Sequence, residues 1–182
     1  EMVMGILYNE DIDWAVGNGI EFYVFNYDRL PVVLDSAKKL GKQAKVHIEV
    51  ETGANRTRLP KKEFTATLNF LKNNADHIVF KGLCTHIGGA ESFSNLFKIN
   101  LQHDRYKNVL KQCKQKGIVP EIRHIACSAA ALAYKDTVYD MVRIGVAQYG
   151  FWPSPDVYYM HLQEIGKQSD GALKRILTWK TD

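Results

Sequence analysis

The sequence predicts an α/β fold in which parallel strands alternate with helices that cover the sheet. Two observations predict it. Short apolar runs typical of strands recur through most of the 182 residues, and stretches with apolar residues at helical spacing separate them. Such alternation is typical of a parallel sheet, because a helix carries the chain back before the next parallel strand begins. An open doubly wound sheet and part of an eight-stranded barrel both fit the pattern.

Six apolar runs are predicted as strands, and they cover residues 2–7, 21–26, 45–52, 79–86, 121–127 and 141–150. The helices predicted between them cover about 10–17, 27–42, 61–74 and 93–116, and an alanine-rich helix follows the fifth run. An intact barrel takes about 250 residues, so six units would form only part of one.

The helix predicted over 27–42 shows the helical pattern most clearly. Its apolar residues recur at helical spacing, at Leu30, Val33, Leu34, Ala37 and Leu40. Gly41 follows them and suits the left-handed position that ends many helices. We therefore expect this helix to end at residue 40 or 41.

Composition and charge narrow the class of protein. The net charge of +4 is spread along the chain in pairs such as Lys38-Lys39, which gives nucleic-acid binding no support. No apolar stretch approaches the roughly 18 residues of a membrane span, and the first ten residues lack the features of a signal peptide. Cys84, Cys113 and Cys127 cannot all pair within one chain, which favours a reducing cytoplasm. The chain starts directly in a predicted strand, so we expect a piece of a longer protein.

Polar residues gather where the predicted strands end. They are Glu49, Thr52, Arg56, His86, Ser128, Arg143 and Gly145. In α/β barrels the site lies at the carboxyl ends of the strands, so this placement predicts a site. Each residue also has a structural explanation: Ser128 as the N-cap of its helix, Arg143 as half of a buried ion pair, and His86 as a core histidine.

The stretch "HIACSAAALAY" (124–134) raises the possibility of a phosphate site. A helix start with a serine hydroxyl and only small neighbours binds phosphate well. Gly145 interrupts the sixth predicted strand, where a ligand can approach the backbone closely. A zinc site built from Cys84, His86, His124 and Cys127 is the competing interpretation, although residues 124 and 127 would face opposite sides of a strand.

Four stretches together resemble the pyridoxal-phosphate (PLP) barrel of the alanine racemase family. They are "VHIEVETGANR" (46–56), "GLCTHIGGAES" (82–92), "HIACSAAAL" (124–132) and "MVRIGVAQYG" (141–150). The resemblance implies a TIM-type (β/α)8 barrel, incomplete at about six of eight units, over residues 1–151. Residues 152–182 would then be an exit segment and the start of a second, β-rich domain that the chain lacks.

The resemblance also assigns roles to residues of this chain. Ser128, with the backbone of Gly145 and Val146, would hold the cofactor phosphate. Arg143 would meet the pyridine nitrogen, and a guanidinium does not give up its proton, so the ring would stay unprotonated. His86 would hydrogen-bond to Arg143 and fix its position. Arg56 would lie near the phenolic oxygen of the ring.

Two departures from the family pattern concern the residues that carry out the reaction. Racemisation in this family uses a lysine that holds the cofactor as a Schiff base and a tyrosine from a partner subunit. We expect neither base on this chain, which lacks a "KANAYGHG"-like motif, and therefore expect the chain alone to be inactive. Glu49 stands where the family often has a carbamylated lysine, and it would offer its carboxylate to Arg56 directly or through a water.

These inferences lead to one expected function and two alternatives. The parent protein is expected to be a bacterial, cytoplasmic, homodimeric, PLP-dependent racemase that supplies D-alanine for peptidoglycan. Alanine is the default substrate, with serine or a basic amino acid still open. A non-catalytic PLP-binding barrel protein and a metal-dependent barrel hydrolase remain as alternatives, and no metal, nucleic acid or membrane is expected in the preferred case.

Overall fold

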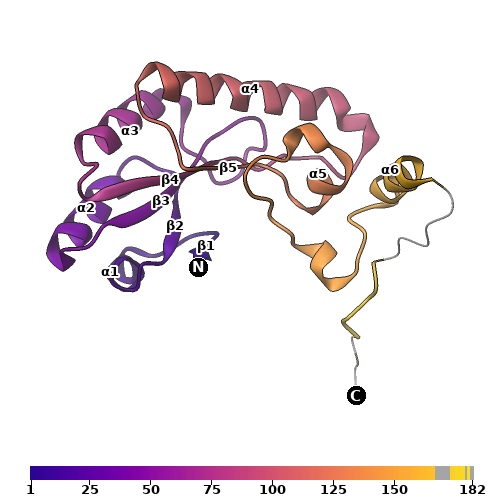
Figure 1. The fold of residues 1–182 in the computed structure, drawn as a ribbon, viewed down its shortest axis with the longest axis horizontal. Helices are drawn as coiled ribbons and strands as arrows, with labels where there is room; N and C mark the ends of the chain where they lie inside the picture. The colour runs from indigo at the N-terminus through magenta and orange to yellow at the C-terminus, as the bar shows by residue number, and fades with distance from the viewer. Residues whose placement is uncertain (167–172, 179, 181–182) are drawn as a thin grey trace.

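The computed structural model describes residues 1–166, 173–178 and 180. Five parallel strands form one sheet, and their order in the sheet is their order in the chain (Figure 1). The strands are β1 (Met2–Val3), β2 (Glu21–Val24), β3 (Ala44–Glu49), β4 (Ile78–Cys84) and β5 (Ile122–His124). A doubly wound sheet reverses its strand order part-way, whereas a barrel wall does not. The chain is therefore an incomplete barrel, as predicted.

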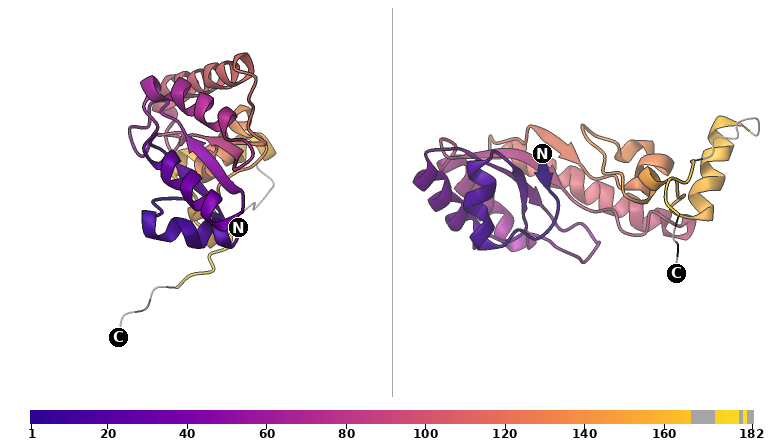
Figure 2. Two further views of the ribbon diagram at one scale, coloured as in Figure 1. Left: turned by 90° about the vertical axis from the view of Figure 1, so that its left-hand side faces the viewer. Right: turned by 90° about the horizontal axis from the view of Figure 1, so that it is seen from below.

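Helices follow the first four strands and lie along the outer side of the curved sheet, and two further helices lie together beyond its end (Figure 1). They are α1 (Ile12–Gly17), α2 (Arg29–Leu40), α3 (Lys61–Asn73), α4 (Leu96–Gln115), α5 (Ser128–Ala133) and α6 (Pro155–Ile165). Short 3-10 turns cover Asn9–Asp11 (η1), Phe93–Asn95 (η2), Lys135–Thr137 (η3) and Val146–Tyr149 (η4). In Figure 1, α4 begins on the side of α5 and α6 and runs back over the sheet, and Figure 2 shows the same ribbon from its left-hand side and from below.

The helix α2 confirms the prediction made from its apolar spacing. Leu30, Val33 and Ala37 are fully buried, and Gly41 ends the helix in the left-handed region at φ 60°. A glycine adopts this conformation without the steric cost of a side chain. The face that α2 buries packs on the sheet and adds to a continuous core under β2, β3 and β4.

The prediction of a sixth strand over 141–150 is wrong. Residues 141–145 are irregular, and η4 follows them. The segment still runs beside β5, because Met141 and Arg143 donate backbone hydrogen bonds to Arg123 and Ala126. However, the guanidinium of Arg143 turns back and engages the carbonyl oxygens of His124 and Ile125. Because a side chain binds these two carbonyl oxygens, residues 141–145 do not form regular backbone hydrogen bonds with β5.

The end of the chain has little regular structure in the part that is described. Residues 173–178 belong to no strand, although the N–H of Ile176 donates to the carbonyl of Tyr149. Of residues 152–182, which the resemblance assigns to an exit segment and the start of a second domain, residues 167–172, 179 and 181–182 lie outside the described residues. The domain boundary at residue 151 and the second domain therefore stay predictions.

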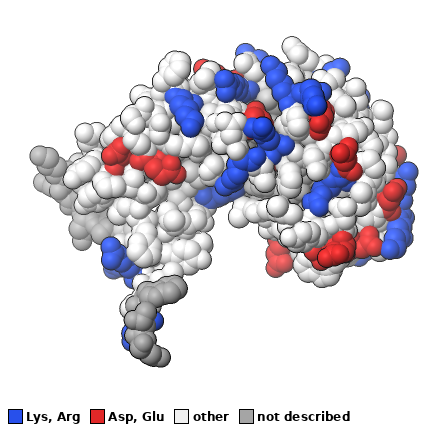
Figure 3. Space-filling view, turned by 180° about the vertical axis from the view of Figure 1, so that it is seen from behind, with Lys and Arg blue, Asp and Glu red and all other residues white. Residues whose placement is uncertain are grey.

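The surface has mixed charge. On the face in Figure 3, Lys and Arg side chains are interspersed with Asp and Glu, in keeping with a net charge of only +4. Within the described residues, no helix combines the length and the apolar character needed to cross a membrane.

Candidate functional site

The six residues predicted to bind the cofactor or substrate line a single cavity of about 340 Å³. They are Arg56, His86, Ser128, Arg143, Gly145 and Val146. They come from four separate segments: the loop after β3, the loop after β4, the start of α5 after β5, and the segment that leads into the first residue of η4. The volume is within the range of small-ligand cavities, which starts near 300 Å³. The structure thus brings together residues up to 90 positions apart in the sequence, from Arg56 to Val146.

Ser128 is the first residue of α5 rather than its N-cap, which is Cys127. Its Oγ accepts a hydrogen bond of 2.8 Å from the backbone N–H of Gly145. The hydroxyl proton remains available for a ligand in the cavity. A Cβ added to Gly145 would meet only Ser128 Oγ, at 3.9 Å, so packing does not require glycine at this position. The glycine instead leaves space in front of the serine.

Arg143 is held rigidly by its two terminal nitrogens. One donates to Nδ1 and to the carbonyl oxygen of His124, at 2.7 and 3.1 Å. The other donates to the carbonyl oxygens of Thr85 and Ile125, at 2.8 and 3.1 Å. These bonds use all four terminal hydrogens and leave the Nε–H as the donor still available. Within the described residues no carboxylate lies within ion-pair distance of Arg143, so the ion-pair explanation does not apply.

The hydrogen bond expected between His86 and Arg143 is not present, because His124 takes that place. His86 lies in the same cavity without a hydrogen-bond partner among the described residues. Burial, together with the positive charges of Arg56 and Arg143, lowers the pKa of His86 to about 4. The imidazole is therefore neutral near pH 7 and accepts or donates through an uncharged ring.

Glu49 is buried at the end of β3 and reaches Arg56 without a bridging group. Its Oε1 lies 3.8 Å from Arg56 Nη2, and its Oε2 accepts a bond of 2.6 Å from Thr57 Oγ1. The Arg56 side chain is 58% exposed and that of Glu49 only 4%. Thr57 therefore fixes the carboxylate more firmly than Arg56 does. At this length the pair with Arg56 is a weak ion pair.

Two residues of the site were not predicted as site residues from the sequence. Tyr23, in β2, lines the cavity, and its buried hydroxyl has no hydrogen-bond partner among the residues that the structure describes. Burial raises the pKa of Tyr23 well above its ordinary value, so the hydroxyl stays protonated. His124, considered only as a metal ligand, binds Arg143. The available signal for Tyr23 was a hydroxyl inside an otherwise apolar strand, and for His124 it was a histidine directly before the apolar residues 125 and 126.

The geometry gives a zinc site no support. Burial raises the pKa of Cys84 to about 12, so its thiol is not the thiolate that zinc prefers. Both ring nitrogens of His124 are engaged, one by Arg143 and one by His47. Over the described ranges 1–166, 173–178 and 180, no group of three or more His, Cys, Asp or Glu residues is arranged to hold a metal ion.

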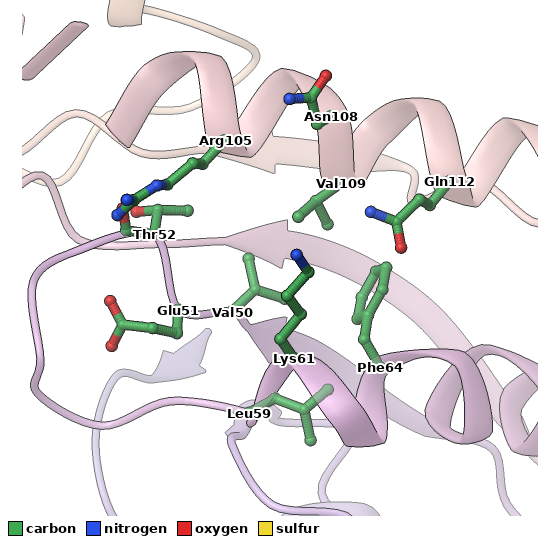
Figure 4. Close-up of a pocket in the computed structure, with 10 residues that line it drawn as sticks. All are labelled: Val50, Glu51, Thr52, Leu59, Lys61, Phe64, Arg105, Asn108, Val109 and Gln112. Carbon is green, nitrogen blue, oxygen red and sulfur yellow. The ribbon is translucent and has the colours of Figure 1, made fainter. Parts of the chain in front are cut away.

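A second cavity, of about 360 Å³, lies outside the barrel between α3 and α4 (Figure 4). Its floor consists of apolar side chains, which include Val50, Leu59, Phe64 and Val109. The Lys61 side chain extends into the space between the helices in Figure 4, and Arg105 binds the carbonyl oxygen of Thr52 at 3.0 Å. None of the six predicted residues lies there, so the cavity around Arg143 is the candidate site.

Comparison with known proteins identifies the family. A family model for the N-terminal domain of alanine racemase matches residues 2–153. The chain belongs to this family. The alanine racemase of Methanococcus maripaludis is 30% identical over 182 residues, and that of Symbiobacterium thermophilum is 29% identical over 180. These matches include 100% and 99% of this chain but only 48% and 45% of the relatives. The chain thus spans about half the length of the alanine racemases that it resembles.

Solved alanine racemases have the same fold over this part. The enzyme of Streptomyces coelicolor superposes with a TM-score of 0.81 at 26% identity, over 86% of this chain and 41% of that one. The enzyme of Bacillus anthracis, solved with L-Ala-P bound, superposes with a TM-score of 0.75 at 28% identity, over 96% of this chain and 42% of that one. The incomplete barrel is therefore the alanine racemase barrel.

Proposed function

We propose that the protein to which this chain belongs is a PLP-dependent alanine racemase, which interconverts L-alanine and D-alanine. The observation that carries the proposal is the convergence of Arg56, His86, Ser128, Arg143 and Gly145 on one cavity in a chain of this family. This reaction is supported by relatives that are named alanine racemase and match the full length of this chain. The L-Ala-P bound to the Bacillus anthracis enzyme supports alanine as the substrate.

The residues of the cavity suit the chemical groups of PLP. The phosphate would be held by the Ser128 hydroxyl and the backbone N–H of Val146, since the N–H of Gly145 is already bonded to Ser128. The free Nε–H of Arg143 would donate to the pyridine nitrogen, and Arg56 would lie near the phenolic oxygen. The hydroxyl of Tyr23, which lies beside the cavity and has no partner in the described part of the chain, would gain one from a bound ligand.

When bound, PLP draws electron density away from the Cα of an amino acid, so that a base can remove its proton. Arg143 shapes this chemistry because a guanidinium donates hydrogen bonds but keeps its proton. A ring nitrogen that accepts from Arg143 stays unprotonated, which restrains the electron withdrawal and limits side reactions. Glu49, which Thr57 fixes, would add a weak attraction that favours Arg56 beside the ring.

The remaining parts of the reaction are proposed for the whole protein. The two bases would be a lysine that holds PLP and a tyrosine of a partner subunit, and no residue of this chain is assigned to either role. The whole protein would therefore be a homodimer. We place it in the cytoplasm, where its D-alanine would serve peptidoglycan synthesis.

Binding of PLP by the 182-residue chain tests the cofactor site separately from catalysis. We expect the absorbance of added PLP to change on binding, and Ser128→Ala to weaken the affinity about fivefold, the equivalent of one hydrogen bond. Ser36→Ala, at a serine buried on α2, is the matched control and should bind like the wild type. A wild-type chain that leaves the PLP spectrum unchanged at millimolar concentration would contradict the assignment of the site.

Racemisation is measured on the whole protein with L-alanine, by the appearance of D-alanine. Turnover supports the racemase. If the whole protein binds PLP but does not racemise L-alanine, serine or a basic amino acid, the non-catalytic PLP-binding barrel is the correct function.

A further inference from the structure

A continuous chain of hydrogen bonds leads away from the site through the interior of the barrel. Arg143 Nη1 lies 2.7 Å from His124 Nδ1, and His124 Nε2 lies 2.9 Å from His47 Nδ1. His47 Nε2 in turn lies 2.8 Å from Oε2 of Glu21. Both imidazoles are 0% exposed, and the Glu21 side chain is 20% exposed. The chain thus joins a residue of the cavity to a carboxylate at the start of β2.

The direction of every bond in this chain follows from its Arg143 end. A guanidinium only donates, so His124 Nδ1 must accept, and the proton of His124 must be on Nε2. This Nε2–H donates to His47 Nδ1, which leaves the His47 proton on Nε2. That proton needs an acceptor, and the Glu21 carboxylate supplies it. Each imidazole is therefore neutral and confined to one tautomer.

The barrel interior is shaped to hold His47 in this orientation. Gly82 pairs with His47 across β3 and β4, and a Cβ at residue 82 would lie 1.9 Å from His47 Nδ1. Tyr23 packs against both imidazoles, with ring centroids 6.0 Å from His47 and 5.9 Å from His124. Gly82 thus leaves the space that the His47 ring occupies, and Tyr23 packs against both imidazoles.

We propose that Glu21 and His47 are positioning residues, which keep His124 in the one tautomer that can accept a hydrogen bond from Arg143. Neither residue touches the cavity, and both act through His124. Arg143 and Glu21 favour the same tautomers from the two ends of the chain. Without the Glu21 acceptor, the Nε2–H of His47 would lose its partner, so this set of tautomers would be less favoured over one in which His47 carries its proton on Nδ1. The statement about the tautomers stands on the geometry alone, while its consequence for PLP rests on the proposed function.

The negative charge of Glu21 also affects the positively charged guanidinium of Arg143. Arg143 is partly buried, and within the described residues its direct partners are neutral. Glu21 is the carboxylate at the far end of the same chain of hydrogen bonds, and polarised hydrogen bonds transmit its influence towards the guanidinium. We therefore expect substitutions at Glu21 to change the strength of the hydrogen bond between Arg143 and His124.

Nitrogen-15 NMR of the histidine rings tests the proposal in the 182-residue chain without PLP. The two nitrogens of a neutral imidazole have distinct shifts, so the spectrum reports the tautomer of each ring. We expect Nε2–H for both His47 and His124 in the wild type. Assignment comes from His47→Asn and His124→Asn, each of which removes one set of signals. Nδ1–H on either ring of the wild type would overturn the proposal, and this outcome requires no variant at Glu21.

Variants of Glu21 then separate the acceptor from the charge. Glu21→Ala removes both, and we expect the population of the Nε2–H tautomer of His47 to fall and the affinity for PLP to fall about fivefold. Glu21→Gln keeps an acceptor oxygen and should restore the wild-type tautomers. Glu121→Gln is the matched control, since Glu121 pairs with Lys81 and lies outside the chain. Unchanged tautomers in Glu21→Ala would overturn the proposal. Wild-type tautomers without PLP binding would instead reject the proposed function and leave the positioning chain intact.

Discussion

Ser128 accepts a hydrogen bond from the backbone N–H of Gly145, and this bond of 2.8 Å joins α5 to the segment before η4. The two residues are 17 positions apart, in parts of the chain that belong to no common strand or helix. The bond holds the irregular segment that carries Arg143 close to the first turn of α5. The serine therefore has a structural role as well as its proposed contact with phosphate.

Substitution of Ser128 by alanine tests that structural role. We expect the free energy of unfolding to fall by about 1 kcal/mol, because the N–H of Gly145 loses its partner. Hydrogen–deuterium exchange at the Gly145 amide should become faster, while exchange in α2 should not change. Equal exchange at Gly145 in both proteins would show that the bond is absent in solution.

Arg143→Lys should destabilise the protein although it keeps the charge. An ammonium group cannot reproduce a planar set of donors to three carbonyl oxygens and an imidazole, so buried acceptors lose their partners. Each unsatisfied acceptor costs about 1–3 kcal/mol, and we expect a total loss of at least about 2 kcal/mol in chemical denaturation. Arg58→Lys, at an exposed arginine, is the control and should change stability little.

Gly82→Ala should destabilise the barrel because the new methyl group would occupy the position of the His47 ring. Overpacking of a core typically costs about 1–3 kcal/mol, and a calorimetric measurement of Tm would detect it. Gly5→Ala is the matched control, since no atom of the described residues lies within 4 Å of a Cβ at residue 5. Similar Tm values for the two variants would mean that the imidazole of His47 lies elsewhere.

Stability should fall as the pH is lowered from 7 to 5. Burial lowers the pKa of His124 to about 3, below its ordinary value of 6.5. As the pH falls below 6.5, the unfolded chain binds a proton at this residue that the folded chain does not, so unfolding is favoured. This histidine alone would reduce the free energy of unfolding by about 2 kcal/mol at pH 5.

Denaturation curves at pH 7 and pH 5 measure this effect. His124→Asn should lose less stability between the two pH values than the wild type, and His77→Asn serves as the control for removing a histidine outside the chain of hydrogen bonds. Equal stability of the wild type at both pH values would contradict the prediction.

Local patterns in the sequence were sufficient for most elements of the fold. The apolar spacing of Leu30, Val33 and Ala37 predicts α2, and Gly41 predicts its end, because both signals depend on near neighbours in the chain. The residues of the cavity were also predictable, since the carboxyl ends of parallel strands meet at one edge of a sheet. The resemblance to alanine racemases added a role for each of them.

The tertiary structure alone decided the features that depend on distant partners. Residues 141–145 have the composition of a strand. However, the side chain of Arg143 donates to the carbonyl oxygens of His124 and Ile125, and the segment does not pair regularly with β5. Likewise, no local pattern shows that His124 rather than His86 binds Arg143.

The sequence by itself determined the alternation of strands and helices and the polar residues at the strand ends, because periodicity and turn chemistry act over a few residues. Only the tertiary structure decided which of these polar groups bond to one another. Glu21, His47 and His124 are separated by 26 and 77 positions, and they meet only because β2, β3, β4 and β5 curve around a common interior. Hydrogen bonds need their atoms within about 3 Å, and the folded barrel sets those distances.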